Sequence, residues 1–513
     1  MRMDTHGARG WLTGLAVMLA MVSGTAGAAV LGNPYALRGY EWGNDWIRYA
    51  DGGNGSLLVA TNRSDLETAT ISRYGSDGQL LGSHSMPSQG NAIASNRVGN
   101  YVVANVTAQG VYATVFNRNG VAIVARFQAS TRGGFVRVAM NESGMFVLTY
   151  LASAPQPNGS TNSLVYARVF NRDGTPRTGE LLISNGDFSV AANSTALAMD
   201  GYGNFVLNLL RIPGPRQGEH RLLRFSRDGV LLDSYNDVTD AAGNGENAGE
   251  SINLTANSAG QFIFGWTGMN LSLTQRLSST RFQRFAANGQ KLGPIVLLGK
   301  DPPDTTGYGL SYGEAQMGLA NDGRYVAVWS QRSSPTDGYA QWNIFAREYR
   351  ADGTPLTDVF RIDTAPATAT VYTDSMRVLM SADGQYTVVW AETDAGQYRQ
   401  WARRFRMEGG PPAPVLNRGV PVGGLSGALN SFQYFRFTVP PNTPSFTVTL
   451  SGGGDADMFI RYGEPPTLAS YDFATGIPGS DEGAMVNNPP PGDFYVGLFG
   501  YSAYSGVSLQ ADW

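Results

Sequence analysis

The chain contains no cysteine. This absence excludes disulfide bonds, thiolate metal sites, cysteine nucleophiles and lipid attachment through an N-terminal cysteine. A protein without disulfides depends on burial for its stability, and 513 residues are enough to form a large core.

Charged residues are scarce, at 15% of the chain, and Lys291 and Lys300 are the only lysines. The formal net charge of -4 argues against a nucleic-acid partner, which would require a basic face. Beyond the N-terminal region, no stretch is long and apolar enough to span a membrane. We therefore expect neither a nucleic-acid partner nor a membrane span, and the oligomeric state stays open.

Histidine is also rare. After the N-terminal segment only His84 and His220 occur, without metal-ligand spacing, so we expect no histidine-based metal centre. A Ser-His-Asp hydrolase would depend on one of these two, and neither lies near a nucleophile motif. No phosphate-binding glycine loop is present either. We assign no catalytic residue, and the sequence favours a protein that is not an enzyme.

The first residues predict export. Residues 1–28 contain Arg2 and Arg9, an apolar stretch from Trp11 to Val22, and the small residues Ala26-Gly27-Ala28. This is the order of a secretory signal peptide. We expect its removal and an extracellular or periplasmic mature protein.

A strand–turn pattern recurs seven times. Each unit has a glycine followed by a strand, as in Gly323-Arg-Tyr-Val-Ala-Val-Trp329, and later an aromatic residue four positions before a second glycine, as in Tyr349/Gly353. Successive closing glycines are 42, 54, 55, 60, 64 and 56 residues apart. A strand-rich repeat of this length is typical of propeller blades.

The pattern predicts an all-β fold with a seven-bladed β-propeller at residues 29–409. The last unit ends at Gly409 without a fourth strand, and Val30 to Tyr40 is free to supply it, which would remove exposed strand edges. Six or eight blades stay open, because the first unit is the least regular. Insertions at Ala152 to Ser163 and Gln331 to Gln341 are expected to be loops on one face.

Two columns of the repeat are expected to be structural. Tryptophan ends the second strand in three units and should pack between blades, and arginine before the closing aromatic residue should form hydrogen bonds between blades. The residues are Trp266, Trp329 and Trp390, and Arg73, Arg224, Arg284 and Arg404.

Residues 410–414 form a proline-rich linker to a C-terminal region at residues 415–513. Runs such as Tyr434-Phe-Arg-Phe-Thr-Val439 and Phe494-Tyr-Val-Gly-Leu-Phe499 indicate short strands separated by turns. We expect a small β-sandwich, jelly-roll-like in type, after the propeller.

The residues of this region closely resemble the bacterial pre-peptidase C-terminal domain. The matching blocks are Gly419-Val, Leu425-Ser-Gly427, Tyr434 to Pro440, Leu450 to Gly463, Tyr471-Asp472, Glu482, Gly492 to Val496 and Gly500 to Leu509. The resemblance implies a β-sandwich that accompanies exported enzymes, mostly proteases, is often removed after secretion, and in some members binds collagen, chitin or other insoluble polymers. The family commonly has a disulfide where this chain has Phe473 and Ala484. The upstream repeats loosely resemble those of bacterial secreted β-propeller proteins, which share no common role.

Two pairs in this region are candidate sites. Tyr501 and Tyr504 stand three residues apart in a glycine-flanked segment and are tentative ligand-binding residues that could stack on a polymer, with packing on the sandwich as the alternative. Asp455 and Asp457 are weak Ca²⁺ ligand candidates, and we favour turn capping for them. No other metal site or cofactor is expected.

Together these patterns predict a secreted, non-enzymatic protein that recognises an extracellular polysaccharide or protein polymer. The alternative is a secreted hydrolase or lyase with its active site in the propeller channel. A propeller glycosidase needs only two suitably separated carboxylates. Many exist and no pair stands out; examples are Asp301, Asp304, Glu314, Asp374 and Glu392. Carboxylates converging at the channel would favour the enzyme, and a small or apolar lining would favour binding.

Overall fold

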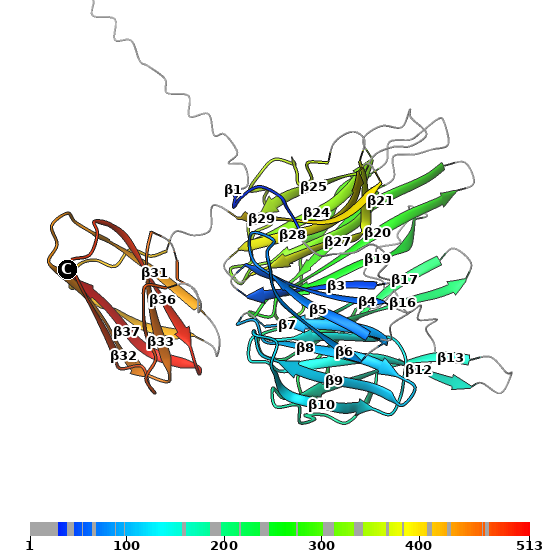
Figure 1. Ribbon diagram of the computed structural model, residues 1–513, viewed down its shortest axis with the longest axis horizontal. Helices are drawn as coiled ribbons and strands as arrows, with labels where there is room; N and C mark the ends of the chain where they lie inside the picture. The colour runs from blue at the N-terminus through cyan, green and yellow to red at the C-terminus, as the bar shows by residue number, and fades with distance from the viewer. Residues whose placement is uncertain are drawn as a thin grey trace, which may run out of the picture.

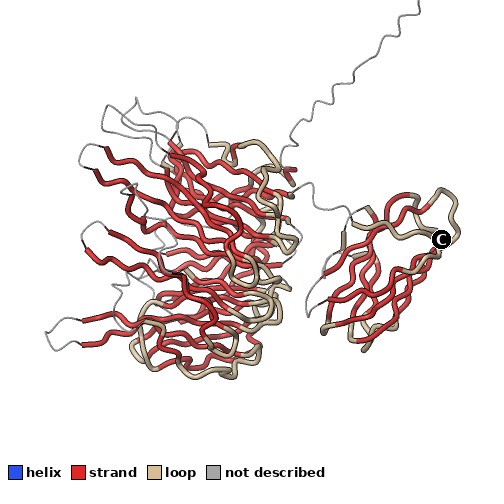
Figure 2. The backbone as a smooth tube through the Cα atoms, turned by 180° about the vertical axis from the view of Figure 1, so that it is seen from behind, coloured by secondary structure: helices blue, strands red, loops and turns tan. Residues whose placement is uncertain are grey.

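The computed structural model describes most of the chain after residue 28. The described residues are 29–37, 46–53, 55–63, 68–87, 89–96, 98–155, 161–184, 196–214, 217–235, 246–272, 275–300, 312–332, 342–365, 369–381, 384–394, 396–407, 413–427, 432–463, 465–466 and 471–513. Their regular structure is entirely β-strand, as Figure 2 shows. They contain no helix long and apolar enough to cross a membrane. The expected signal peptide lies outside the described residues.

Seven antiparallel sheets follow one another along the described part of residues 29–406 (Figure 1). We number them as blades 1 to 7 in chain order. Blade 1 contains β3 (Trp46–Gly53), β4 (Ser56–Arg63), β5 (Thr68–Tyr74) and β6 (Leu80–Pro87). Blade 2 contains β7 (Gln89–Ser95), β8 (Tyr101–Thr107), β9 (Gly110–Phe116) and β10 (Ala122–Ser130). Blade 3 contains β11 (Val136–Met140), β12 (Phe146–Pro155), β13 (Thr161–Phe170) and β14 (Leu181–Leu182).

The remaining blades repeat this order. Blade 4 contains β15 (Leu197–Met199), β16 (Phe205–Gly214), β17 (Gln217–Phe225) and β18 (Leu231–Tyr235). Blade 5 contains β19 (Glu246–Ala256), β20 (Phe262–Ser272), β21 (Gln275–Phe285) and β22 (Lys291–Lys300). Blade 6 contains β23 (Tyr312–Leu319), β24 (Tyr325–Arg332), β25 (Trp342–Tyr349) and β26 (Phe360–Arg361). Blade 7 contains β27 (Thr370–Met380), β28 (Gln385–Asp394) and β29 (Gln397–Arg406), with β1 (Ala29–Val30) and β2 (Tyr35–Ala36) on its outer edge.

The blades form a closed ring. Their first strands contact one another in the cycle β3, β7, β11, β15, β19, β23, β27 and back to β3, so these strands surround the propeller axis. The N-terminal strands supply the edge that blade 7 lacks: Val30 pairs with Phe405, and Ala36 pairs with Trp401. The predicted seven-bladed propeller and its closure by the N-terminal segment are confirmed.

The repeat signature is an aromatic pair across the second and third strands. In blades 2 to 7 the aromatic residue after the opening glycine lies opposite the closing aromatic residue, and the two rings stack with centroids 4.4 to 5.2 Å apart. Tyr325 and Tyr349, for example, are almost parallel, at an interplanar angle of 3°. Such pairs stabilise a sheet beyond the area they bury.

Seven apolar cores lie between neighbouring blades, one for each pair around the ring. Trp266 and Trp390 belong to cores between blades, which confirms the predicted packing for these two, whereas Trp329 is buried against Phe345 of its own blade. Three arginines of the predicted column reach the next blade: Arg73 donates to the carbonyl of Arg118, Arg224 to that of Ala287, and Arg284 to those of Ala351 and Asp352. The inter-blade hydrogen bonds are therefore confirmed for these three.

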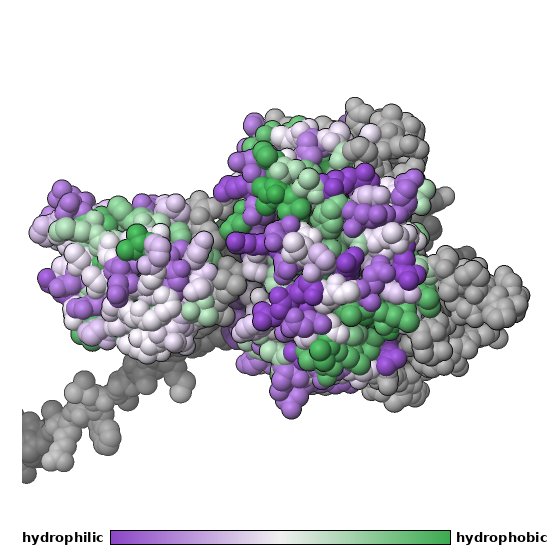
Figure 3. Space-filling view, turned by 90° about the horizontal axis from the view of Figure 1, so that it is seen from below, coloured by the Kyte–Doolittle hydropathy of each residue, from purple (hydrophilic) through white to green (hydrophobic). Residues whose placement is uncertain are grey.

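The outer strands are much less buried than the rest. Along β10 most side chains are exposed, including Ile123 at 53%, and Leu81 and Leu231 are similarly exposed on β6 and β18. Seen from below, the surface is a mixture of polar and apolar patches (Figure 3). Side chains on the inner strands of a blade are therefore more buried than those on its outermost strand.

The C-terminal region forms a separate sandwich of two four-stranded sheets, β30-β37-β32-β35 and β31-β36-β33-β34. Its strands are β30 (Val422–Gly427), β31 (Phe432–Val439), β32 (Ser445–Gly453), β33 (Ala456–Tyr462), β34 (Phe473–Thr475), β35 (Glu482–Asn487), β36 (Gly492–Gly500) and β37 (Tyr504–Asp512). One core lies between the sheets, around residues such as Phe437, Val448 and Val496.

One expected loop is largely strand. The insertion Ala152 to Ser163 continues the hairpin of β12 and β13, with Ala152 opposite Leu164 and Pro155 opposite Thr161. Small and polar side chains do not prevent this, because backbone pairing holds the ladder. The other insertion, Gln331 to Gln341, lies mostly outside the described residues, since β24 ends at Arg332 and β25 begins at Trp342.

Candidate functional site at the propeller axis

One position on each first strand forms a ring around the propeller axis. It is the seventh residue before the opening glycine of the blade, and pairing places it opposite the fifth residue after that glycine, as in Arg137 with Thr149 and Arg377 with Val389. We call these seven positions the axial ring. They are Arg48, Ala92, Arg137, Ala196, Asn253, Gln316 and Arg377.

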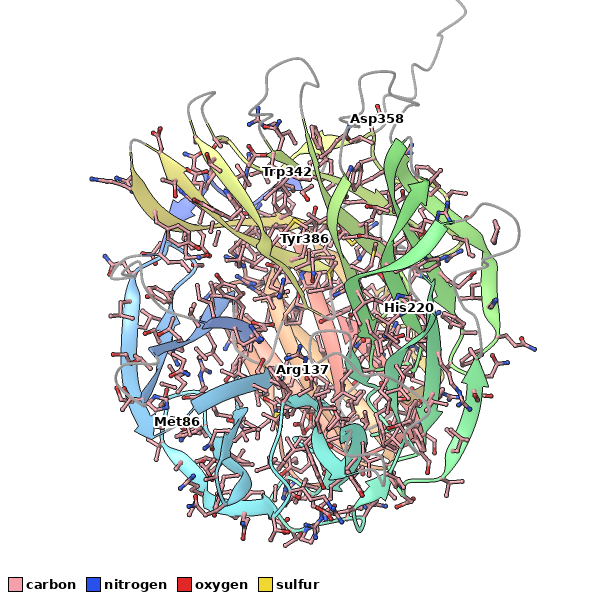
Figure 4. All side chains as sticks on the ribbon, turned by 90° about the vertical axis from the view of Figure 1, so that its right-hand side faces the viewer. Met86, Arg137, His220, Trp342, Asp358 and Tyr386 are labelled. Atoms are coloured by element: carbon pink, nitrogen blue, oxygen red, sulfur yellow. The ribbon has the colours of Figure 1, made fainter. Side chains whose placement is uncertain are left out.

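Three arginines of the axial ring converge. Burial, followed by the charges of Arg137 and Arg377, lowers the pKa of Arg48 to about 9. Burial and the charge of Arg377 also lower the pKa of Arg137. Blade 3, which carries Arg137, is not adjacent to blades 1 and 7, so these charges meet across the axis. In Figure 4, which views the propeller from the right-hand side of Figure 1, Arg137 lies close to the centre of the ring of blades.

Amide side chains occupy another part of the axial ring. Asn253 on blade 5 donates from Nδ2 to Oε1 of Gln316 on blade 6, over 3.0 Å. The Oδ1 atom of Asn253 accepts a hydrogen bond from the backbone N–H of Met317, over 2.9 Å. These bonds fix the orientation of both amides. The ring therefore combines cations with oriented hydrogen-bonding groups.

The first strands of four blades are irregular just before the axial ring. Register shifts interrupt β7 between Gln89 and Asn91, β19 between Ala248 and Ile252, β23 between Tyr312 and Ala315, and β27 between Tyr372 and Arg377. Bulges of this kind are frequent next to active sites, where they redirect side chains. The interrupted segments contain Glu250, Glu314 and Asp374.

The carboxylates named from sequence fall into three groups. Asp301 and Asp304 lie outside the described residues. Glu314 and Asp374 lie on first strands, close to the axial ring along the chain. Glu392 is buried on blade 7, where Nε1 of Trp390 donates to its Oε2 over 3.3 Å; burial raises the pKa of Glu392, and the charges of Asp363 and Asp394 raise it further. Among the described residues, no three His, Asp or Glu side chains are placed to hold a metal ion.

The two histidines pack between neighbouring blades, His84 between blades 1 and 2 and His220 between blades 4 and 5. His84 lies against Phe116, with ring centroids 4.7 Å apart, and burial lowers its pKa. His220 is fully buried on β17 and meets Phe264 edge-on, at 5.2 Å. Neither residue belongs to the axial ring.

In the sandwich, Tyr501 is 64% exposed, whereas Tyr504 is 3% exposed and belongs to the core. Only Tyr501 is therefore accessible to a polymer in this structure. Phe473 is 37% exposed, and Ala484 packs against the core.

Asp455 accepts a hydrogen bond from the backbone N–H of Gly479, over 3.0 Å. Burial raises the pKa of Asp457 to about 6, and the charges of Glu482 and Asp455 add to the shift. Because Gly479 lies 24 residues further along the chain, the contact of Asp455 with it joins two loops and is not a cap of the turn before Met458. Turn capping and Ca²⁺ binding both stay predictions.

Comparison with known proteins identifies the C-terminal region. The model of the bacterial pre-peptidase C-terminal domain matches residues 431–500, so the chain carries this domain. A virulence metalloprotease of Vibrio anguillarum is 37% identical over 102 residues, which are 20% of this chain and 17% of that protein. A zinc metalloprotease of Helicobacter pylori is 39% identical over 103 residues, 20% of this chain and 40% of that protein. The chain thus covers well under two thirds of either relative.

Among solved structures, the polysaccharide lyase Uly1 matches 76% of this chain and 94% of its own, with 10% identity and a TM-score of 0.43. With identity and TM-score this low, no function of that protein can be assigned to this chain.

The axial arginines were not predicted from the sequence. They lie on the first strand of each unit, before the opening glycine at which the recognisable repeat pattern begins. A signal was present: three of the seven units carry arginine at the seventh position before that glycine.

Proposed function

We propose that this protein is an exported hydrolase or lyase that acts on an extracellular polymer at the axial ring. The observation that supports this most is the convergence of Arg48, Arg137 and Arg377 on the propeller axis. Charged groups with perturbed pKa values that gather in one place within a fold are candidates for a functional site.

The ring supports an enzyme better than the binding-only function favoured by the sequence. A small or apolar lining would have suited binding alone, but five of the seven positions carry arginine, asparagine or glutamine. The relatives that share the C-terminal domain are named as proteases, which also supports an enzyme. Recognition without catalysis is the second candidate, and the exposed Tyr501 favours it.

The C-terminal domain serves, in this proposal, in secretion or in attachment to the polymer. Its relatives in secreted proteases support an extracellular or periplasmic location. The propeller then carries the reaction, and the sandwich brings it to the substrate.

The test is an activity screen of the mature protein, residues 29–513, on acidic and neutral polysaccharides and on collagen. New reducing ends, new carbon–carbon double bonds and soluble peptides are measured. We expect product from one polymer, loss of that product in Arg137→Gln, and no change in Arg126→Gln, an exposed arginine on β10. Retention on a polymer without product would favour recognition alone, and the absence of both would overturn the proposal.

A further inference from the structure

Two buried asparagines extend the core between blades 1 and 2. Leu58 and Ala60 of β4 and Val103 of β8 belong to this core. Alternate residues of a strand point to the same face, so Asn62 on β4 and Asn105 on β8 face the same junction. Asn62 is 8% exposed and Asn105 is 0% exposed. An apolar junction between blades therefore ends in two enclosed amides.

The polar atoms of these amides have no protein partner. In the part of the chain that the structure describes, Oδ1 of Asn62 and both Oδ1 and Nδ2 of Asn105 are buried without a hydrogen bond. A buried amide without a partner costs free energy, and nearly all buried polar groups in folded proteins bond to protein or to ordered water. The two asparagines therefore require a partner that is not a protein group.

A third asparagine shows how such a residue is otherwise satisfied. Asn257 of blade 5 is 4% exposed, so it is comparably buried. Its Nδ2 atom donates to the carbonyl of Ala320 on blade 6 over 2.9 Å, and its Oδ1 atom accepts from the backbone N–H of Gln261 over 3.0 Å. Burial of asparagine between blades is thus compatible with complete pairing, which Asn62 and Asn105 do not have.

We infer that Asn62 and Asn105 bind ordered water between blades 1 and 2. Water fits an enclosed site of this kind, because it is small and can donate to Oδ1 atoms while it accepts from Nδ2. The three unpaired atoms lie within the range of about two to four polar partners that a buried water has. This inference concerns the junction between two blades and does not depend on the proposed function.

The repeat shows which side chains the water replaces. Asn62 is the seventh residue after the opening glycine of blade 1, and Asn105 is the sixth after that of blade 2. At the junction of blades 3 and 4 the same positions carry Leu151 and Leu209, which pack in one apolar core. Blades 5, 6 and 7 carry tryptophan at the sixth position. Asparagine is smaller than leucine or tryptophan, so these two positions fill less of the junction in blades 1 and 2.

Unpaired polar atoms recur at the same positions of blade 6. Trp329 and Ser330 are its sixth and seventh residues after the opening glycine, and Nε1 of Trp329 and Oγ of Ser330 are also buried without a partner among the described residues. These two point to opposite faces of β24, because they are neighbours in one strand. Asn62 and Asn105 face a single junction, and for this reason we place the water there.

The test is a crystal structure of the mature protein, residues 29–513, at a resolution that shows ordered waters. We expect a water within hydrogen-bond distance of Oδ1 or Nδ2 of Asn105. The variant Asn62→Leu/Asn105→Leu reproduces the leucine pair of blades 3 and 4, and its structure should show leucine in place of this water. In solution, magnetic relaxation dispersion of the water signal should count fewer long-lived internal waters in the variant than in the parent.

A matched control applies the same change to the satisfied asparagine. Asn257→Leu leaves the carbonyl of Ala320 and the N–H of Gln261 without their partner, so it should lower the midpoint of urea unfolding. Asn62→Leu/Asn105→Leu should not lower that midpoint, because it removes unpaired amides together with their water.

Protein groups bonded to both asparagines, with no water at the junction, would overturn the inference. An equal count of internal waters in parent and double variant would do the same. If the double variant does not fold, the structure of the parent alone decides. None of these results bears on polymer cleavage, so the inference can fail while the proposed function stands.

Discussion

Asp457 in the sandwich is a partly buried carboxyl group beside two other acidic residues. Its pKa is about 6 in the folded protein, against an ordinary value of 3.8, so the folded state binds the proton more tightly than the unfolded state. Stability from this group is therefore greatest at low pH and decreases as the pH rises from about 4 to about 6. We expect Asp457→Asn to remove this decrease. The measurement is the unfolding temperature of the sandwich across that range.

The same variant tests the Ca²⁺ prediction. If Asp455 and Asp457 bind Ca²⁺, millimolar calcium should raise the unfolding temperature of the parent above pH 6 and leave Asp457→Asn unchanged. An identical pH slope in parent and variant would show that another group is responsible for it.

Alanine substitutions at two glycines with positive φ can distinguish the cost of backbone strain from the cost of crowding a neighbouring side chain. Gly353 (φ 94°) lies against the Arg284 guanidinium, which donates to the carbonyls of Ala351 and Asp352, whereas Gly396 (φ 77°) has no other atom near its missing Cβ. Gly396→Ala should cost about 1 kcal/mol from strain alone. Gly353→Ala should cost about 2 to 3 kcal/mol, because it also displaces Arg284. Urea unfolding of both variants measures the difference, and equal losses would exclude a role for the inter-blade contact.

For single residues, structural roles were easier to predict from the sequence than functional roles. The closing glycines and aromatic residues recur at fixed offsets, so they were predictable as turns and packing positions. Tyr504 has the same local setting as Tyr501, and only the fold shows that it points into the core. The axial arginines come from three blades that are distant in the chain, and their proximity depends on ring closure.

The element that completes the ring is the N-terminal segment of β1 and β2. Leu37, just after β2, is 5% exposed in the core between blades 7 and 1, whereas Leu31, just after β1, is 37% exposed. Both donate a backbone hydrogen bond to β29. We expect Leu37→Ala to destabilise the propeller by about 3 kcal/mol and Leu31→Ala by less than about 1 kcal/mol. Urea denaturation measures both, and a small effect of Leu37→Ala would mean that the closing segment contributes little.

Strands were predictable where aromatic and branched residues alternate, because those residues suit a pleated surface. The extended hairpin of β12 and β13 was not, since Ser153, Ala154 and Asn162 carry no such pattern and are paired through the backbone. The β-bulges of the first strands leave no local signature. The interrupted segments of the first strands, which contain Glu250, Glu314 and Asp374, therefore could not be located from the sequence.

For the whole molecule, the described cores divide into two independent sets. Val448 belongs to the core of the sandwich and Val328 to the core between blades 6 and 7, and both are fully buried. We expect calorimetry to show two unfolding transitions. Val448→Ala should lower only the sandwich transition and Val328→Ala only the propeller transition, each by about 2 kcal/mol of unfolding free energy. A shift of both transitions by either variant would show that the two regions unfold as one unit.

Ring closure also determines when the fold can be completed during synthesis of the chain. Ala29 pairs with Arg406, so a strand that is synthesised among the first has no partner until the last blade has been made. Until then the emerging propeller exposes two free sheet edges, which are sites of aggregation. Synthesis of this chain therefore includes an interval of aggregation risk, and its length is set by the time needed to make seven blades. Dedicated protection of the nascent chain matters most during that interval.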